Sequence, residues 1–245
     1  MYRKIKNRKQ IYEHVILRTR IYRIFSRRIA GIGSHTQYRP TQTLFFYLRE
    51  LQKWNRHINL SGSDDDCFII QHHFLDSLSC VLAPVIPPQS RILDIGTGAG
   101  FPGIPLKLYH PDLHVTLLDA VEKKIMFLRH LCRSLGLERT ECLAVRLPSS
   151  ADSKTSQSLP DRLTSNRFDV IVSRAVGTVP LLIDLACPFL APDGHIVLQR
   201  GKQGRQESEE QQKLFERAGL HMVSLIDIPL SFLEHPRYLL ILRRV

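Results

Sequence analysis

The sequence has no apolar run approaching the roughly 18 residues of a membrane-spanning helix, so we expect no membrane protein. Its five cysteines include no Cys-x-x-Cys pair and no metal-spaced cluster, which excludes the common zinc and redox motifs. Such cysteines are typical of a reducing compartment, and we predict a cytoplasmic protein, expected to be a monomer. The 245 residues, 43% of them hydrophobic, are enough for one substantial core with a smaller satellite unit.

Positive charge is concentrated at the N-terminus. Residues 1–33 contain ten Lys or Arg and a single acidic residue, Glu13, and hold most of the formal net charge of +11. Clustered cations bind nucleic-acid phosphates, and an Arg-rich, acid-poor start is also typical of a transit peptide. The same residues are also explained by an unstructured, solvated extension, or by an upstream start codon wrongly taken as the start of the protein. We interpret residues 1–35 as a disordered basic extension and leave its role open.

Two helices are predicted ahead of the main domain, within residues 36–88. Thr41 or Thr43 can cap the first, in which apolar residues recur at helical spacing from Leu44 through Trp54 to Ile58. This placement favours Trp54 as a core residue over a base-stacking one. The second is an apolar-periodic run from about Cys67 to Val85, which ends at a proline-rich stop. We expect this preface to pack on the domain of residues 89–245.

Short apolar runs alternate with helical patterns from Arg91 onward. The predicted strands span residues 91–95, 114–119, 141–147, 168–173, 195–200, 221–227 and 238–243. The predicted helices lie near residues 103–110, 121–136, 178–190 and 205–218. Alternation of this kind predicts an α/β fold with a doubly wound, mostly parallel sheet. No helix separates the last two strands, so we expect an antiparallel edge.

One segment interrupts this alternation. Residues 149–166 contain six serines, two threonines and no aromatic residue. We expect a segment of this composition to bury nothing. We therefore expect a flexible insert between the third and fourth strands.

The stretch "ILDIGTGAGFPG" places four glycines at the turn between the first strand and the first helix. These are Gly96, Gly98, Gly100 and Gly103. Glycine permits positive φ and lets a ligand pack against bare amides, and ligands of doubly wound sheets bind at this turn. The stretch therefore predicts a binding site for a nucleoside-like ligand.

Acidic residues distinguish this turn from a dinucleotide site. Asp94 precedes it, where a carboxylate suits a cation better than a pyrophosphate, and Phe101 stands where a dinucleotide fingerprint requires its third glycine. Asp119 ends the second strand, a position from which a carboxylate binds ribose hydroxyls. A nucleoside with a positive charge and no polyphosphate fits these residues, which predicts S-adenosylmethionine as the cofactor.

Several motifs together resemble a known family. "ILDIGTGAGFPGIPL", "VTLLDAVEKKIMFLRHL", "FDVIVSRAVG", "WNRHINLS" and "HHFLDSL" closely resemble bacterial 16S ribosomal RNA guanine-N7 methyltransferases, the RsmG or GidB family. The resemblance runs from about Leu44 to Arg243. It implies a Rossmann-like class I methyltransferase fold and methyl transfer from S-adenosylmethionine to N7 of the loop guanine numbered 527 in 16S ribosomal RNA. The implied partner is that RNA or the small ribosomal subunit.

The resemblance also implies cofactor contacts. They fall on Gly96, Phe101, Leu147, Pro148 and Arg174. The family usually has an acidic residue where this chain has Pro148. The main chain supplies that contact, or a carboxylate of the insert, Asp152 or Asp161, replaces it.

The chemistry of the acceptor needs no general base. N7 of guanine carries an in-plane lone pair and no proton, so it can attack a sulfonium methyl directly. The protein has to supply alignment, which is worth up to about 7 to 11 kcal/mol in intramolecular reactions. We therefore assign no catalytic base, and expect Arg174, at the end of the fourth strand, to position a phosphate or the guanine O6.

Other polar residues are weaker candidates. The candidate RNA contacts are Arg146, Arg200, Lys202, Arg205 and Arg237. His72, His73 and Asp76 share helical spacing, but no further ligand completes a tetrahedral set, so we predict no metal site and expect them to join the preface to the main domain.

Three other functions remain open from the sequence. The chain could methylate a small molecule or a protein, or it could be a non-catalytic RNA-binding or ribosome assembly factor on the same fold. An NAD-dependent enzyme is disfavoured by Phe101. The sequence does not distinguish naked ribosomal RNA from an assembled particle as the substrate.

Overall fold

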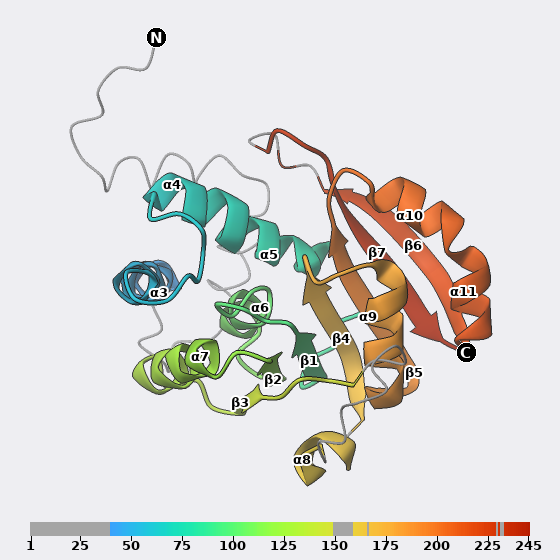
Figure 1. Cartoon of the computed structure of the whole chain (residues 1–245), viewed down its shortest axis with the longest axis horizontal. Coiled ribbons are helices and arrows are strands. Elements are labelled where there is room, and N and C mark those ends of the chain that lie inside the picture. Colours follow the sequence, from blue (N-terminus) through green and yellow to red (C-terminus); the bar gives the residue numbers. More distant parts are fainter. Residues whose placement is uncertain (1–39, 149–158, 166, 229, 231–232) are drawn as a thin grey trace.

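The computed structural model describes residues 40–148, 159–165, 167–228, 230 and 233–245, so the predicted basic extension of residues 1–35 lies outside it. A seven-stranded sheet crosses this part of the chain in the order β3-β2-β1-β4-β5-β7-β6 (Figure 1). Its strands are β1 (Arg91–Ile95), β2 (His114–Asp119), β3 (Thr140–Ala144), β4 (Phe168–Arg174), β5 (Leu190–Arg200), β6 (Leu220–Ile228) and β7 (Arg237–Arg244).

The sheet confirms the predicted doubly wound topology. The strands β3, β2, β1, β4 and β5 are parallel neighbours, whereas β7 pairs antiparallel with both β5 and β6. The chain leaves β1 towards β2 on one side and later returns to β4 on the other. The carboxyl ends of β1 and β4 therefore lie side by side at the switch point, where ligands of such sheets bind.

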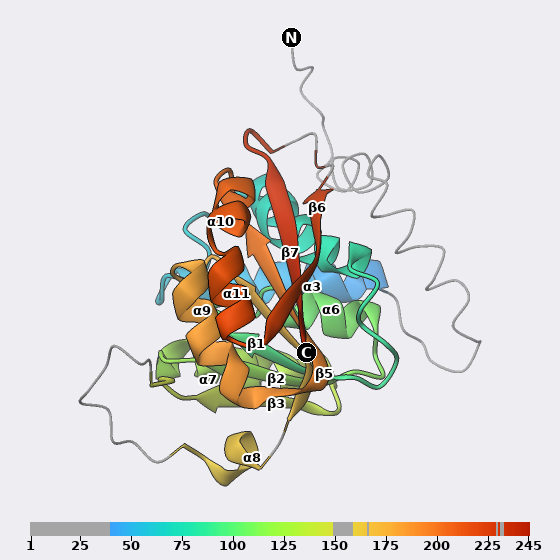
Figure 2. The same cartoon turned by 90° about the vertical axis from the view of Figure 1, so that its right-hand side faces the viewer.

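Helices cover both faces of the sheet (Figures 1 and 2). They are α6 (Gly103–Tyr109), α7 (Glu122–Ser134), α8 (Asp161–Thr164), α9 (Val179–Ala186), α10 (Gly204–Glu210) and α11 (Gln212–Arg217). Successive strand residues point to opposite faces, so Ile92 joins the core under α6 and α7 while Leu93 joins the core under α9 and α11. The two apolar clusters hold the sheet rigid on both sides.

The preface packs on the α6 and α7 side. Its first helix, α3 (Pro40–Asn55), contributes Tyr47 and Leu51 to that core, and both are fully buried. The predicted cap is wrong, because the helix begins at Pro40 and both Thr41 and Thr43 lie inside it. Ile58 lies beyond the end of the helix and still packs on the core.

The second preface segment is not one regular helix. It consists of α4 (Asp66–Ile69), a π-helical turn η1 (Ile70–Leu75), α5 (Asp76–Leu78) and a 3₁₀ turn η2 (Ser79–Leu82). Asp65 caps its start by accepting a hydrogen bond from the Phe68 amide over 2.7 Å. Wide turns of this type often occur at functional sites.

Some predicted boundaries differ from the structure. The strand β3 ends at Ala144 rather than at residue 147, β5 begins at Leu190 rather than at residue 195, and the helix predicted at residues 205–218 is divided into α10 and α11. Residues 159–165 of the predicted insert are ordered enough to form α8, and Leu163 is fully buried in the core beside Phe168. The prediction that the insert buries nothing is therefore wrong there, while residues 149–158 and 166 lie outside the described residues.

Candidate functional site

The turn between β1 and α6 is built from glycines in a backbone conformation that other residues rarely adopt. Gly96, Gly98 and Gly100 have φ values of +70°, +59° and +104°. A Cβ on Gly96 would lie 2.3 Å from Val176 Cγ2, whereas a Cβ on Gly98 would meet nothing closer than the Gly96 carbonyl oxygen at 4.0 Å. The backbone at Gly98 is therefore bare and faces open space.

Asp94 lies beneath this turn and is completely buried. Its Oδ2 accepts hydrogen bonds from Thr97 Oγ1 over 2.7 Å and from the Gly103 amide over 2.8 Å. Among the described residues Oδ1 has no partner. Burial raises the pKa of Asp94 to about 7, against the pull of those hydrogen bonds. A cation bound nearby would stabilise its charged form.

Asp119 connects the end of β2 to the glycine turn. Its carboxylate accepts hydrogen bonds from the Gly98 amide over 3.0 Å and from the Val121 amide over 2.9 Å, and Lys124 Nζ lies 3.8 Å away. Because an ionised carboxylate has about four lone-pair positions, it can still accept hydroxyl donors.

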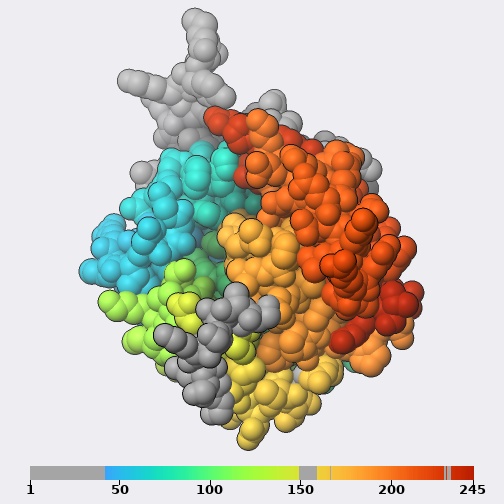
Figure 3. Space-filling model, turned by 45° about the vertical axis from the view of Figure 1, so that its right-hand side comes forward, coloured from blue at the N-terminus to red at the C-terminus, as the bar shows by residue number. Residues whose placement is uncertain are grey.

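A cavity of about 710 Å³ opens beside the glycine turn. Its lining comes from the preface, from the turn after β1 and from the loops after β4 and β5. Polar groups and bare backbone on its walls come from His73, Asp76, Gly98, Arg174, Gln199 and Arg237. Figure 3 shows the preface, in cyan, and the segments following β4 and β5, in orange, meeting on one face of the molecule. The cavity thus lies at the switch point of the sheet.

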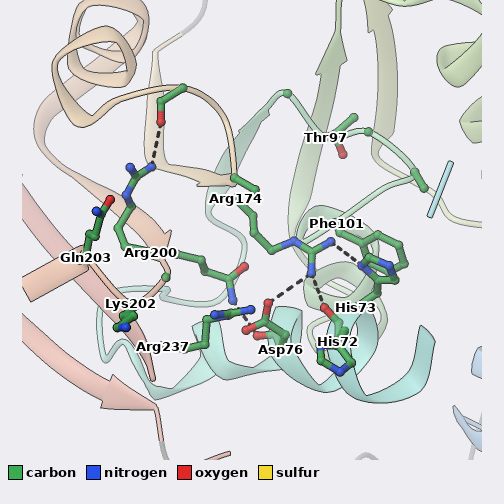
Figure 4. Close-up of a pocket in the computed structure, with 18 of the residues that line it drawn as sticks. His72, His73, Asp76, Thr97, Phe101, Arg174, Arg200, Lys202, Gln203 and Arg237 are labelled. Carbon is green, nitrogen blue, oxygen red and sulfur yellow. Dashed lines mark hydrogen bonds and ion pairs between the residues drawn. The ribbon is translucent and has the colours of Figure 1, made fainter. Parts of the chain in front are cut away.

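Arg174, the last residue of β4, reaches across the cavity to the preface (Figure 4). Its Nη1 donates hydrogen bonds to the His72 carbonyl oxygen over 2.8 Å and to Asp76 Oδ2 over 3.3 Å, and its Nη2 donates to His73 Nδ1 over 2.9 Å. The guanidinium carbon lies 5.0 Å from the centre of the Phe101 ring. Four groups, on η1, α5 and the turn after β1, therefore fix the orientation of this side chain.

The state of His73 follows from these contacts. Its Nδ1 accepts the Arg174 hydrogen bond, so the ring proton is on Nε2, which lies 3.1 Å from the Ser61 carbonyl oxygen. Burial and the Arg174 charge lower the pKa of His73 to about 4. The ring is thus neutral near neutral pH, and it stacks on Phe101 at a centroid distance of 5.1 Å.

The predicted RNA contacts fall into two groups. Arg200 is bound by Glu207 through hydrogen bonds of 2.8 and 2.9 Å, and Arg205 lies 3.1 Å from Asp227. Lys202 and Arg237 line the cavity, as Arg200 does, but no carboxylate of the described residues forms an ion pair with either. Arg146 is exposed and lies outside the cavity lining. Lys202 and Arg237 are therefore the cations best placed for a phosphate.

The pair expected to contact the cofactor after β3 lies elsewhere. Leu147 is buried in the core under α9, Pro148 is exposed, and neither belongs to the cavity lining. Asp161, one proposed replacement for the acidic contact, is in the first turn of α8, and Asp152 lies outside the described residues.

Sequence reasoning missed Gln199, which is 4% exposed near the end of β5 and lines the cavity. Its Nε2 donates hydrogen bonds to the Asp76 carbonyl oxygen over 2.6 Å and to Ser79 Oγ over 3.0 Å. In the sequence, only the position of Gln199 near the carboxyl end of a predicted strand indicated a role in the site. No sequence pattern indicates that residue 199 contacts residue 76. Trp54, by contrast, packs on the core as predicted, 5.7 Å from the Phe127 ring centre.

Comparison with known proteins places this geometry in a family. A family model described as rRNA small subunit methyltransferase G, or GidB, matches residues 41–228. The chain belongs to this family. It is 37% identical over 214 residues to the Ribosomal RNA small subunit methyltransferase G of Geotalea uraniireducens (strain Rf4), covering 87% of this chain and 92% of that one. The protein of the same name from Geobacter sulfurreducens (strain ATCC 51573 / DSM 12127 / PCA) is 38% identical over 191 residues, with coverages of 78% and 82%.

Solved structures agree on the fold. A SAM dependent methyltransferase from Aquifex aeolicus has a TM-score of 0.54 at 16% identity, over 85% of this chain and all of that one. A chain of a fibrillarin/Nop5p complex has a TM-score of 0.52 at 14% identity, over 70% of this chain and 84% of that one. The Rossmann-like class I methyltransferase fold of this family member is thereby confirmed. Among the described residues, no helix has the length and apolar character needed to cross a membrane.

Proposed function

We propose that this member of the methyltransferase G family transfers a methyl group from S-adenosylmethionine to N7 of a guanine in 16S ribosomal RNA, the guanine numbered 527 by family resemblance. Family membership supports the RNA substrate. The observation that carries the proposal is the cavity itself, which has the glycine turn on one side, with Asp94 buried beneath that turn, and the cations Arg174, Lys202 and Arg237 on the other. One side suits a positively charged nucleoside and the other suits RNA.

The residues around the turn fit this cofactor. S-adenosylmethionine supplies a methyl group activated by a positively charged sulfonium. Asp94, completely buried beneath the turn, has a carboxylate whose charged form a cation above the turn would stabilise, and Asp119 retains lone pairs for hydroxyl donors. The bare backbone of Gly98 leaves room for close approach, and Gly96 also lines the cavity. These four residues would hold the cofactor.

The cationic side of the cavity would orient the acceptor. Guanine N7 has no proton to lose, so the chain needs no general base and contributes by positioning. Arg174 is held in place by the preface and keeps N–H donors in addition to the three it uses there. Lys202 and Arg237 are suited to bind phosphates that flank the guanine.

The test is methylation of small-subunit RNA in a deletion strain. Borohydride and aniline cleave RNA at N7-methylguanine, and primer extension maps the cut. We expect the cut in the parent strain, its loss in the deletion strain, and its return with the wild-type gene but not with Arg174→Ala. A deletion strain that keeps the cut would contradict the proposal.

A binding measurement separates an enzyme from a non-catalytic assembly factor. We expect calorimetric titration of the purified protein with S-adenosylmethionine to show one site per chain. Absence of binding would favour the assembly factor. Methyl transfer to naked 16S RNA and to small subunits, measured side by side, identifies the physical form of the substrate.

We further propose that the chain acts as a monomer in the cytoplasm. All five cysteines are free thiols, which suits a reducing compartment.

A further inference from the structure

Three polar side chains form a continuous group at one wall of the cavity. Arg174 Nη1 lies 3.3 Å from Asp76 Oδ2, and Gln199 Nε2 lies 2.6 Å from the Asp76 carbonyl oxygen. All three residues line the cavity, and each comes from a different element, β4, α5 and β5. Figure 4 shows Arg174 and Asp76 facing each other at this wall.

Two acceptor atoms in this group have no hydrogen-bond partner among the described residues. They are Asp76 Oδ1 and Gln199 Oε1, on side chains that are 5% and 4% exposed as residues. An unsatisfied buried acceptor costs about 1 to 3 kcal/mol, so such atoms usually have a partner. Two of them on one cavity wall indicate a ligand that brings hydrogen-bond donors.

The orientation of the Gln199 amide is fixed by its neighbours. The Asp76 main-chain carbonyl can only accept, so the amide nitrogen of Gln199 must face it, and Oε1 must point away from it. Gln199 is therefore an acceptor towards the remaining space, as the Asp76 carboxylate is. Along the cavity wall, the hydrogen-bonding groups are therefore a donor on Arg174, an acceptor on Asp76 and an acceptor on Gln199, in that order.

This order complements the Watson–Crick edge of guanine. Guanine presents an acceptor at O6, a donor at N1–H and a second donor at its 2-amino group. Adenine presents a donor at its 6-amino group and an acceptor at N1, which would oppose both Arg174 and Asp76. Unpaired polar groups of this kind allow a site to reject the wrong partner strongly.

We propose that Asp76 and Gln199 select guanine at this site, with Asp76 Oδ1 accepting N1–H, Gln199 Oε1 accepting the 2-amino group and Arg174 donating to O6. The inference rests on the proposed function. Both acceptor oxygens are covered in the structure, so an entering base has to turn them outward. That movement exchanges the hydrogen bonds of Asp76 Oδ2 and Gln199 Nε2, on the same planar groups, for hydrogen bonds to the base. The edge bearing O6 is then held while N7 stays free for the methyl group.

The test replaces the target guanine by inosine, which lacks the 2-amino group but keeps O6, N1–H and N7. The substrate is small-subunit RNA ligated with a single inosine, assayed with tritiated S-adenosylmethionine. We expect kcat/KM of the wild type to fall at least tenfold on this RNA. Inosine at a neighbouring, non-target guanine controls for altered RNA folding and should leave kcat/KM within twofold. Equal rates on target guanosine and target inosine would overturn the inference without any variant.

A variant locates the effect on Gln199. Gln199→Met retains the length of the side chain and removes the acceptor, and we expect it to reduce the guanosine-to-inosine ratio to about one. Ser79→Ala is the matched control, because Ser79 Oγ contacts the Gln199 nitrogen over 3.0 Å but not its oxygen. It should keep the wild-type ratio even if it lowers stability. An unchanged ratio in Gln199→Met, or an equal loss in Ser79→Ala, would contradict the assignment.

Two outcomes separate this inference from its foundation. If the wild type methylates no small-subunit RNA, the proposed function fails. If it methylates guanosine RNA but tolerates inosine equally, the inference fails and the proposed function stands. If Gln199→Met weakens S-adenosylmethionine binding as strongly as it weakens methylation, the two unpartnered acceptor oxygens bind the cofactor and not the guanine. The inference is then also overturned.

Discussion

Replacing Asp94 by asparagine should stabilise the free protein and weaken cofactor binding at the same pH. Asp94 is fully buried, and burial raises its pKa from 3.8 to about 7. The folded state then binds the proton more tightly than the unfolded state, so the contribution of Asp94 to stability is complete below pH 3.8 and is lost as the pH rises to about 7. Asparagine has no charge to bury and removes this loss.

The magnitude follows from the pKa shift. One pKa unit corresponds to about 1.4 kcal/mol, and roughly two units of the window lie above pH 5, so the wild type should lose about 3 kcal/mol between about pH 5 and pH 8 relative to Asp94→Asn. Asparagine can still accept from Thr97 and Gly103 through its oxygen, and its nitrogen would replace Oδ1, which has no donor to lose. The fold should therefore survive the change.

Two assays check this reasoning. Urea unfolding at about pH 5 and pH 8 gives the difference in free energy of unfolding between Asp94→Asn and the wild type. In calorimetry over the same pH range, the affinity of the wild type for S-adenosylmethionine should rise with pH through about pH 7, because the cation favours ionised Asp94. The affinity of the variant should not change with pH, and at about pH 8 it should be lower than that of the wild type. Parallel pH profiles for both proteins would refute the argument, since other titrating groups are common to the two.

Three further predictions concern the rest of the site. Gly98→Ala and Gly136→Ala each place a Cβ in open space, at φ of +59° and +61°, so each should lower the free energy of unfolding in urea by about 1 kcal/mol. Only Gly98→Ala should weaken S-adenosylmethionine binding. Equal cofactor affinity of the two variants would contradict a bare ligand surface at Gly98. Lys202→Ala and Arg237→Ala should each reduce the slope of log affinity for ribosomal RNA against log salt concentration by up to about 0.9. Arg200→Ala should leave that slope unchanged. It should lower the free energy of unfolding by about 2 kcal/mol, because it leaves Glu207 without its hydrogen-bond partner. His73→Asn keeps an acceptor for Arg174 and should retain more kcat than His73→Leu, with little change in cofactor affinity; identical kcat values would show that His73 does not position Arg174.

The sheet and the glycine turn were predictable because local patterns determine them. Alternating strand and helix periods fixed the order of the elements, and the run from Asp94 to Gly103 combines a strand end, positive φ positions and a helix start within ten residues. Asp119 was predictable for the same reason, since the end of a strand next to the switch point follows from topology.

The acceptor side of the cavity was not predictable from local patterns. The hydrogen bond between Arg174 and Asp76 joins residues 98 apart, and the bond from Gln199 to Asp76 spans 123 residues. His72, His73 and Asp76 share a spacing that also fits a metal site, and only their contacts with Arg174 reveal what they do. Leu163 was missed because one buried leucine in a serine-rich segment has no periodic signal.

The contacts between the π-helical turn η1 and Arg174 determine when, during synthesis on the ribosome, each part of the cavity can form. The ribosome makes the preface before β4, so His72 waits for a partner 102 residues further along the chain. The glycine turn can form early, whereas the guanine-binding wall exists only after β4 and β5 have emerged and docked. A nascent chain stalled before residue 174 should therefore contain the methyl donor's half of the cavity without its acceptor half.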